Sequence, residues 1–233
     1  MLVPRTRTLI APGAVHVPDW LDLKTQRRLV EACRDWASGN AGMRHTRLPS
    51  GHLMSVQTVC LGWHWSPTRS SSRGRSGSAD QPRNYSRTVD DGRTPVKEFP
   101  SWLGDLARRA VAEAYEDPRA AEAYQPDIAL VNFYDENATL GMHQDRDEKS
   151  LAPVVSLSLG APCLFRFGNT QNRNRPWTDI ELRSGDLFVF GGPSRLAFHG
   201  VPKGILTSPS DPMPDIGLAH GRLNITIRES GFA

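Results

Sequence analysis

Cysteine is scarce in this 233-residue sequence, and no long hydrophobic run occurs. The three cysteines, Cys33, Cys60 and Cys163, lie far apart, each in apolar sequence. Because an odd number of widely spaced cysteines is typical neither of a disulfide framework nor of a zinc site, we expect reduced core residues. The N-terminal residues hold no apolar run of signal-peptide length, and no segment resembles a membrane span. A cytoplasmic protein without a membrane partner is therefore expected.

Lysine is also scarce. Only four of the 28 basic residues are lysine and 24 are arginine, while the formal net charge is +3. So small a net charge does not by itself indicate a polyanionic partner. The guanidinium of arginine suits forked contacts with phosphate and carboxylate better than the ammonium of lysine does. The same skew also results from a GC-rich genome.

Helical periodicity is confined to the first half of the chain. Asp22 is the expected N-cap of a helix over 23–37, where apolar residues recur at helical spacing. A second helix is predicted to start at Ser101, its expected N-cap, and to run to about residue 116, where an Asp-Pro pair breaks it. Residues 1–20 are interpreted as an extended lead-in.

Short apolar runs between turns are typical of strands. The predicted strands are Leu53–Trp65 (a strand or hairpin), Ile128–Tyr134, Val154–Leu159, Cys163–Phe167, Thr178–Leu182, Leu187–Phe190, Leu196–Phe198 and Leu223–Arg228. Their even spacing and their Gly, Pro and Asn punctuation indicate antiparallel sheets in a barrel or jelly roll. We predict one mainly β (α+β) domain over 1–233, with an N-terminal cover over about 1–118 and a β core over about 119–233.

One stretch, Ser66–Arg93, contains almost no apolar residue. Its first half is rich in serine, arginine and glycine, so it can bury little and is expected to be mobile. The stretch is either an ordinary flexible insertion or a basic loop that follows a nucleic-acid backbone. In the second case the bordering aromatic residues Trp63, Trp65 and Tyr85 would stack on bases.

A histidine and a carboxylate stand two residues apart in His143-Gln144-Asp145. On extended backbone both side chains project from the same side. With a distant second histidine they would form the 2-His-1-carboxylate triad of non-haem Fe(II) oxygenases. His199, 54 residues after Asp145, is the best third ligand, because the other histidines lie in lead-in, loop or aromatic segments. The pair alone also fits a solvated turn.

The last predicted strand alternates polar and apolar residues. Arg222, Asn224 and Arg228 share its polar face, and the two arginines are about 20 Å apart along the strand. This face is either solvated or lines the inside of a barrel, where two forked guanidinium groups can bracket a small dianion. Asn132 and Tyr134 alternate in the same way on their own strand and offer neutral donors.

These segments together resemble the AlkB family of Fe(II)- and 2-oxoglutarate-dependent dioxygenases, and within it the bacterial AlkB subgroup. The resemblance rests on N-F-Y followed by H-Q-D-R-D-E, on P-V-V-S-L-S-L-G, on G-D-L-F-V-F-G-G-P-S-R-L-A-F-H-G and on R-L-N-I-T-I-R, in this order. It is continuous over about 120–230 and reaches back to Met54–Val56 and Leu61–Trp63. It implies a double-stranded β-helix, or jelly-roll, core with N-terminal helices and a nucleotide-recognition lid.

The resemblance implies an iron site and a co-substrate site. His143, Asp145 and His199 would hold Fe(II) at the catalytic centre and leave positions for 2-oxoglutarate and O2. Arg222 would pair with the distal carboxylate of 2-oxoglutarate, and Arg228 would lie beside the carboxylate that chelates the iron. The expected 2-oxoglutarate-binding residues are Asn132, Tyr134, Arg222, Asn224 and Arg228.

By the same resemblance, the protein is expected to be an oxidative demethylase that repairs N-alkylated bases such as 1-methyladenine and 3-methylcytosine. Its partner would be single- or double-stranded DNA, with RNA as an alternative. The reaction would convert 2-oxoglutarate into succinate and CO2, hydroxylate the N-methyl group and release it as formaldehyde. A target base in a duplex must be flipped out of the stack. The protein is expected to act as a monomer.

Contacts with the base are also implied by the resemblance. Trp63 matches the family aromatic that stacks on the flipped base, with His143 on the opposite side. Asp147 would approach the exocyclic amino group or the positive charge of the lesion, although Asp147 and Glu148 also fit a solvated turn. Tyr85 is expected to meet the nucleic-acid backbone. Further candidates for phosphate contacts are Arg83, Arg87, Arg173 and Arg175.

Two segments depart from the family pattern. The stretch between Trp65 and Tyr85 is longer than the family requires, and residues 201–221 form a long loop rich in proline and aspartate. Both concern access of the substrate, so they leave the substrate range open. Two alternatives therefore remain: an oxygenase of the same chemistry acting on RNA, protein or a small molecule, or a non-catalytic nucleic-acid-binding module on the same β scaffold.

Overall fold

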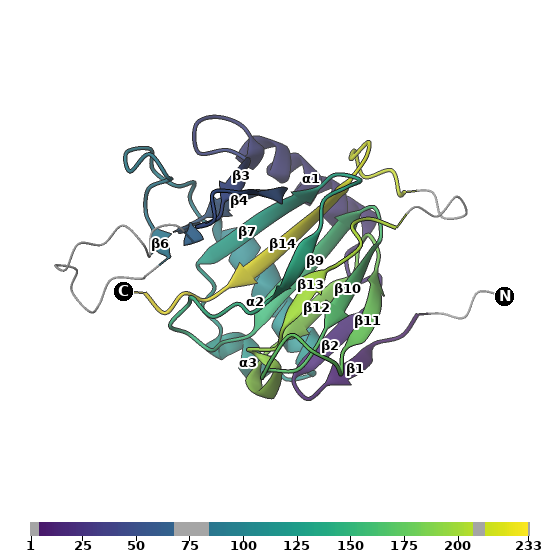
Figure 1. Cartoon of the computed structure of the whole chain (residues 1–233). Coiled ribbons are helices and arrows are strands. Elements are labelled where there is room, and N and C mark those ends of the chain that lie inside the picture. Colours follow the sequence, from purple (N-terminus) through teal and green to yellow (C-terminus); the bar gives the residue numbers. More distant parts are fainter. Residues whose placement is uncertain (1–4, 68–83, 207–212, 233) are drawn as a thin grey trace.

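The computed structural model describes residues 5–67, 84–206 and 213–232 (Figure 1). Its elements are β1 (Thr8–Ala11), β2 (Ala14–Val17), α1 (Leu23–Ala37), β3 (Arg44–Arg47), β4 (Leu53–Leu61), β5 (His64–Trp65), β6 (Tyr85–Ser86), α2 (Ser101–Tyr115), α3 (Pro118–Ala123), β7 (Ile128–Tyr134), β8 (Leu140–His143), β9 (Val154–Gly160), β10 (Cys163–Phe167), β11 (Thr178–Leu182), β12 (Leu187–Phe190), β13 (His199–Val201) and β14 (Arg222–Arg228). Most of the predicted mobile stretch, including Arg83, and residues 207–212 of the long loop lie outside the described residues.

Two antiparallel sheets form the core. The larger has eight strands in the order β1-β2-β12-β9-β14-β7-β4-β3, and the smaller has four in the order β11-β10-β13-β8. In Figure 1 the yellow strand β14 lies in the middle of the larger sheet, between β7 and β9. Phenylalanines of β10 and β12 pack against one another between the two sheets. The predicted jelly roll is therefore confirmed.

The alternation along β14 divides the core into two parts. Leu223, Ile225 and Ile227 point to the face that packs on the two long helices, α1 and α2, which lie behind the sheet in Figure 1. The polar residues between them face the space between the sheets, where Arg222 is 1% exposed and Arg228 is 6% exposed. This polar face is thus an internal lining, and the alternative of a solvated face is wrong.

The helix predictions are mostly confirmed. Helix α1 spans the predicted residues, and Asp22 caps it by accepting a hydrogen bond from the backbone N–H of Thr25 (2.7 Å). Helix α2 begins at Ser101, but its N-cap is Pro100, because the Pro100 carbonyl already accepts the first helical hydrogen bonds. The predicted Asp-Pro break is correct, although the proline then begins the short helix α3.

Two strand predictions need correction. The run Leu196–Phe198 is not a strand. Backbone hydrogen bonds from the N–H of Arg195 to the Gly192 carbonyl and from the N–H of Ala197 to the Ser194 carbonyl make it the end of a 3-10 helix and the turn that follows. The strand that follows, β13, begins only at His199. Residues 1–20 are more than a lead-in, since β1 and β2 form a hairpin that extends the larger sheet beside β12. None of the described helices is long and apolar enough to cross a membrane.

Candidate active site

A cluster of two histidines and one aspartate lies where the two strands β8 and β13 meet. His143 ends β8 and His199 begins β13, and the strand register pairs the two residues directly, with ring centroids 4.4 Å apart. Asp145 follows two residues after β8, and its carboxylate oxygens lie 3.6 Å from Nε2 of each histidine. The three potential ligand atoms all lie within 4.8 Å of one another.

Hydrogen bonds orient both imidazoles for metal binding. Nδ1 of His143 lies 2.9 Å from the Gly141 carbonyl, and Nδ1 of His199 lies 3.0 Å from the Ala197 carbonyl. Each Nδ1 therefore carries the proton, which leaves the Nε2 lone pair free to face Asp145. Burial lowers the pKa of His199 to about 4, so this imidazole is neutral at physiological pH, as a ligand must be. The donor set fits a non-haem Fe(II) ion.

Asp145 is held ionised by its surroundings. Burial alone would raise the pKa of its carboxyl group, but Arg228 and the two histidines keep that pKa below its usual value. The Nη2 atom of Arg228 lies 2.8 Å from Asp145 Oδ2. The carboxylate is thus negatively charged and partly neutralised before any metal ion binds.

Glu148 is a functional residue whose role the sequence did not reveal. Its side chain is fully buried and contacts Arg228 (Oε1 to Nη1, 2.9 Å), Arg195 (Oε2 to Nη2, 3.2 Å) and the hydroxyl of Tyr85 (2.5 Å). Arg195 also donates a hydrogen bond to the carbonyl oxygen of Asp145. The alternative of a solvated turn is wrong for Glu148. The available signal was the lone arginine in an otherwise small and apolar segment, G-G-P-S-R-L-A-F.

Behind the triad lies an inner cavity that contains all five predicted co-substrate residues. Its lining includes Asn132, Tyr134, His143, His199, Arg222, Asn224 and Arg228. Most donors of the Arg222 guanidinium lack a partner: Nη2 donates to Ser158 Oγ (2.9 Å), while the buried Nε and Nη1 atoms have no partner among the described residues. A buried guanidinium without a carboxylate is costly. The cavity therefore fits the carboxylate of an anionic ligand such as 2-oxoglutarate.

The second arginine of β14 has a different environment from the one predicted. Both terminal nitrogens of Arg228 are engaged by Asp145 and Glu148, and only Nε is without a partner. Asn224 donates to Ser156 Oγ and to the Leu157 carbonyl. Both residues still line the inner cavity. The hydrogen bonds of these two residues therefore support the triad and its surroundings, and within this pair only Nε of Arg228 is free to contact a co-substrate.

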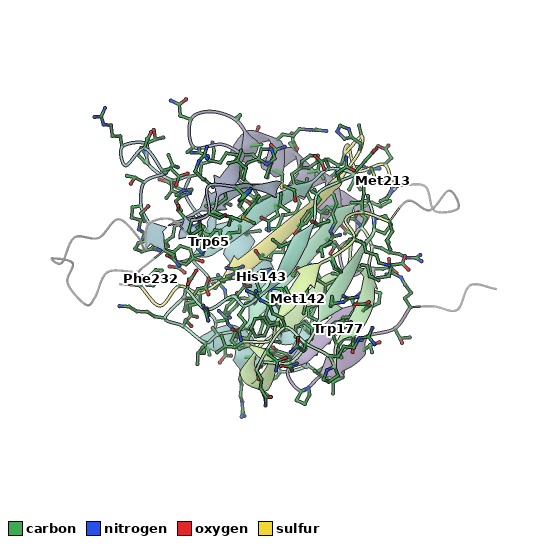
Figure 2. The ribbon with its side chains drawn as sticks, viewed as in Figure 1. Trp65, Met142, His143, Trp177, Met213 and Phe232 are labelled. Carbon is green, nitrogen blue, oxygen red and sulfur yellow. The ribbon has the colours of Figure 1, made fainter. Side chains whose placement is uncertain are left out.

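In front of the triad, an outer cavity of about 360 Å³ opens toward solvent. Polar residues of its wall include His143, Asp145, Asp147 and Glu148, and its apolar wall includes Trp65. Asp147 therefore lines the same cavity as the triad, and its contact with a base stays a prediction. The Trp65 indole Nε1 donates a hydrogen bond to Asp147 Oδ2 (2.7 Å). Figure 2 labels Trp65 and His143, which contribute to this same cavity from different elements.

Trp63 and Tyr85 do not line the outer cavity. Gly62 has a left-handed φ of +77° and lies so close to the Asp127 carbonyl that a Cβ atom would not fit. This turn carries Trp63 into a buried cluster with Tyr85, where only 7% of Trp63 is exposed. Tyr85 is buried against Glu148, so its hydroxyl is not presented to a nucleic-acid backbone.

The arginines proposed as phosphate contacts differ in their surroundings. Arg87 lies with its guanidinium carbon 3.8 Å above the Trp63 ring and donates to the Gly62 carbonyl, so it serves the buried cluster. Arg173 and Arg175 are exposed near Phe198 and Trp177, respectively. All three arginines are exposed, but Arg87 already has these partners within the protein.

Comparisons with known proteins agree with this geometry. Residues 13–228 match the family described as the 2OG-Fe(II) oxygenase superfamily. The DNA N(6)-methyladenine demethylase ALKBH1D of Arabidopsis thaliana is 33% identical over 97% of this chain and 51% of its own length. The alpha-ketoglutarate-dependent dioxygenase AlkB of Escherichia coli is 34% identical over 95% of this chain and 92% of its own length. The solved structure of OsALKBH1 has a TM-score of 0.79 at 30% identity, covering 96% of this chain and 99% of that chain.

The chain thus spans about half the length of the Arabidopsis relative and nearly all of the bacterial one. The match includes every strand that carries a residue of the triad or of the inner cavity. The chain belongs to the AlkB family of 2OG-Fe(II) oxygenases, whose cofactors are Fe(II), 2-oxoglutarate and O2.

Proposed function

We propose that this protein is an oxidative demethylase of N-alkylated bases, such as 1-methyladenine and 3-methylcytosine, in DNA. The observation that carries the proposal is the position of the triad between two cavities of different character. The inner cavity offers the unpaired guanidinium of Arg222, and the outer cavity offers the carboxylate of Asp147. An anionic co-substrate and a cationic base can therefore approach the same metal from opposite sides.

The residues of the inner cavity would position the co-substrate. His143, Asp145 and His199 would hold Fe(II), and Arg222 would pair with the distal carboxylate of 2-oxoglutarate in a forked contact. Burial raises the pKa of Tyr134 well above its usual value, so its hydroxyl stays protonated and can donate a hydrogen bond into this cavity. Asn132 and Asn224, already hydrogen bonded to Thr58 and Ser156, would form the polar wall.

When bound, Fe(II) and 2-oxoglutarate would let O2 oxidise the N-methyl carbon, with one oxygen atom going to succinate as CO2 is released and the other to the methyl carbon, which is lost as formaldehyde. The outer cavity would hold the base after it has been extruded from its strand. Asp147 would stabilise the positive charge that methylation at N1 of adenine or N3 of cytosine creates. Arg173 and Arg175 would contact phosphates, which is a sequence-independent contribution to affinity.

The relatives' names support a nucleic-acid substrate, since one is described as a DNA demethylase. The choice between single- and double-stranded DNA, the use of RNA, the monomeric state and the cytoplasmic location stay predictions.

A direct test uses single-stranded DNA oligonucleotides that carry one 1-methyladenine or one 3-methylcytosine. With Fe(II), ascorbate and 2-oxoglutarate in air, wild-type protein should restore the base and release formaldehyde and succinate in equal amounts. Mass spectrometry of the oligonucleotide measures the loss of one methyl group. The Asp145→Ala variant should bind DNA normally but form no succinate, and the same oligonucleotides in RNA form compare the two substrates.

Three outcomes would contradict the proposal. If wild-type protein leaves both lesions untouched, repair of these bases is not its function. Turnover of 2-oxoglutarate stimulated only by a protein or a small molecule would indicate a different oxygenase. DNA binding without any succinate formation would indicate a non-catalytic module.

A further inference from the structure

The two strands that carry the histidine ligands are joined by little of their own backbone. Strand β8 has four residues and β13 has three. His143 pairs with His199 and Leu140 pairs with Val201, so three residue steps on β8 match only two on β13, and the register is irregular next to the triad. A short and irregular pairing leaves the separation of the two imidazoles poorly fixed by the strands alone.

The triad itself does not hold the two strands together. With the proton on Nδ1 of each imidazole, both Nε2 atoms present lone pairs, and these face the negatively charged carboxylate of Asp145 at 3.6 Å. Electron pairs and a negative charge that converge in this way repel one another until a cation lies between them. The ligands must therefore be held in place by contacts from elsewhere in the chain.

Gln144, the middle residue of the His-x-Asp motif, provides one such contact. Its side-chain Nε2 lies 2.6 Å from the Leu196 carbonyl oxygen and 3.1 Å from the Thr170 carbonyl oxygen. Because both neighbours are acceptors, only the NH2 group can face them, and each of its two hydrogens is used. Leu196 lies three residues before His199, so this side chain connects the segment that carries two ligands to the segment that carries the third.

A second side chain crosses between the same two segments in the opposite direction. Arg195 is 2% exposed, and its Nη1 donates to the Asp145 carbonyl oxygen at 2.5 Å. Gln144 thus bonds to the backbone that precedes His199, and Arg195 bonds to the backbone of the aspartate ligand. We call this reciprocal pair of hydrogen bonds, Gln144 to Leu196 and Arg195 to Asp145, the ligand clamp.

The bond to Thr170 extends the ligand clamp to the loop between β10 and β11. That loop is already attached to the turn that precedes β13. The N–H of Phe198 donates to the Asn169 carbonyl, and the N–H of Gly168 donates to the Phe198 carbonyl, both at 2.8 Å. The amide of Gln144 is therefore the point where segments 26 and 52 residues further along the chain are joined to the triad.

We propose that Gln144 is a positioning residue, which fixes the spacing of the two ligand segments through the ligand clamp and so preorganises the three ligands for the metal ion. The proposal rests on the proposed function only in that the triad holds Fe(II), and it does not depend on which substrate is oxidised. Preorganisation of this kind raises metal affinity, because less chain entropy is lost when the ion binds. Gln144 acts through the position of His199 and not by contact with the ion.

The test compares Gln144→Met with wild type, each as the whole chain. Methionine has a similar length but no N–H donor, so both hydrogen bonds are lost. The two freed carbonyls belong to one exposed and one half-buried residue, which water can reach, so the melting temperature of the ligand-free protein should fall by no more than about 4 °C. Anaerobic titration with Fe(II) should show an affinity weakened about 10- to 100-fold, the usual effect of removing a group that supports a metal ligand.

Gln125→Met is the matched control. Gln125 also donates from its side-chain amide to a backbone carbonyl, that of Glu122 at 3.3 Å, but it is exposed and follows α3 in a segment that carries no triad ligand. The chemical change is therefore the same, without any effect on the ligand clamp. This variant should bind Fe(II) like wild type.

Hydrogen exchange followed by mass spectrometry separates positioning from a general loss of stability. In ligand-free Gln144→Met, peptides that contain residues 194–200 should exchange faster than in wild type, whereas peptides of α1 and β14 should exchange at the wild-type rate. Fe(II) should restore the protection over 194–200, because the ion then links the same two segments.

The outcomes distinguish this proposal from the proposed function. If Gln144→Met binds Fe(II) like wild type, the ligand clamp does not hold the triad. Weaker binding that comes with unchanged exchange over 194–200, with faster exchange throughout the chain, or with an equal loss in Gln125→Met would also reject a positioning role. In each of these cases wild type still binds Fe(II), and the proposed function stands. If wild-type protein binds no Fe(II), the proposed function fails, and the positioning role fails with it.

Discussion

Substitution of Glu148 by glutamine removes one negative charge from a buried cluster of two carboxylates and two guanidinium groups. The four charges of Asp145, Glu148, Arg195 and Arg228 cancel in the folded protein. After substitution, Arg195 loses its carboxylate partner and Arg228 keeps only that of Asp145, so two buried positive charges face one negative charge within the cluster. Removal of one partner from a buried ion pair costs about 3–5 kcal/mol. Because the glutamine oxygen can still accept one hydrogen bond, we expect the lower end, about 3 kcal/mol, which corresponds to a melting temperature about 6–12 °C lower for a chain of this length.

The same substitution should weaken the metal site. With Glu148 neutral, Arg228 interacts more strongly with Asp145 Oδ2, which lies 2.8 Å away, and therefore competes with the metal for that oxygen. Loss of a group that supports a metal ligand typically reduces metal affinity by about 10- to 100-fold. Anaerobic titration with Fe(II), followed by the loss of free metal, measures this change without any need for catalytic turnover.

Glu181→Gln is the matched control. Glu181 pairs with Arg183 at 2.8 Å, but both side chains are at least 40% exposed, so the same chemical change should cost less than about 1 kcal/mol. Urea unfolding of both variants at pH 7 gives the comparison. If the two variants differ by less than about 1 kcal/mol in the free energy of unfolding, and Glu148→Gln binds Fe(II) like wild type, the buried cluster does not support the triad.

Three further substitutions test other charged groups. Burial opposes the charge on His64, but the hydrogen bond to Asp90 raises the pKa of His64 to about 9, so its contribution to stability is complete below about pH 6.5 and is lost as the pH rises through 9. In urea titrations, Asp90→Asn should therefore lower the free energy of unfolding by about 1 kcal/mol at pH 6 and have no effect at pH 10. The expected loss is this small because Asp90 is half-exposed and solvent screens its charge. Arg222→Met should weaken binding of 2-oxoglutarate at least about 30-fold, as measured by calorimetry, and should leave the melting temperature of the ligand-free protein equal or higher. A clear drop in that temperature would show that Arg222 stabilises the fold instead. Asp186→Asn should destabilise the fold by about 3 kcal/mol at pH 7, because it leaves the guanidinium of Arg5 without its buried partner. The difference from wild type should shrink in acid, where the carboxyl group of the wild-type protein is protonated. Equal stability of the two proteins at pH 7 would contradict this prediction.

The fold was predictable because it depends on local patterns, and the triad was predictable because several motifs in order resemble one family. Short apolar runs between turns placed β7, β10, β11, β12 and β14 within a residue of their observed bounds. The strand that carries His199 was displaced, because an apolar run can be folded into a turn as readily as into a strand and periodicity does not distinguish the two. The error did not affect the choice of His199 as a ligand, because His199 follows directly after the displaced run.

The partners of charged residues were not predictable in the same way. Glu148 lies in a run of five consecutive charged residues, 145–149, and such a run is usually solvated. Its burial depends on Arg195, 47 residues later, and on Tyr85, 63 residues earlier. Contacts over these separations follow from how the strands fold back, which alternation does not specify. The same reason explains why Trp63 and Trp65, two residues apart in sequence, differ in which of them reaches the outer cavity.

The two arginines of β14 show how partners decide function when position does not. Arg222 and Arg228 share a strand, a face and nearly complete burial, and the sequence assigned both to the co-substrate. Arg228 is neutralised by two carboxylates, so it can hold the metal-binding aspartate in place but has little charge left for an anion. Within the described part of the chain, the side chain of Arg222 has only a serine hydroxyl as a partner, so the free energy of its burial remains uncompensated until a carboxylate enters. An unpaired buried charge is therefore the better indicator of a ligand site, and by this criterion Arg222, among the described residues of the inner cavity, is the group that awaits a ligand.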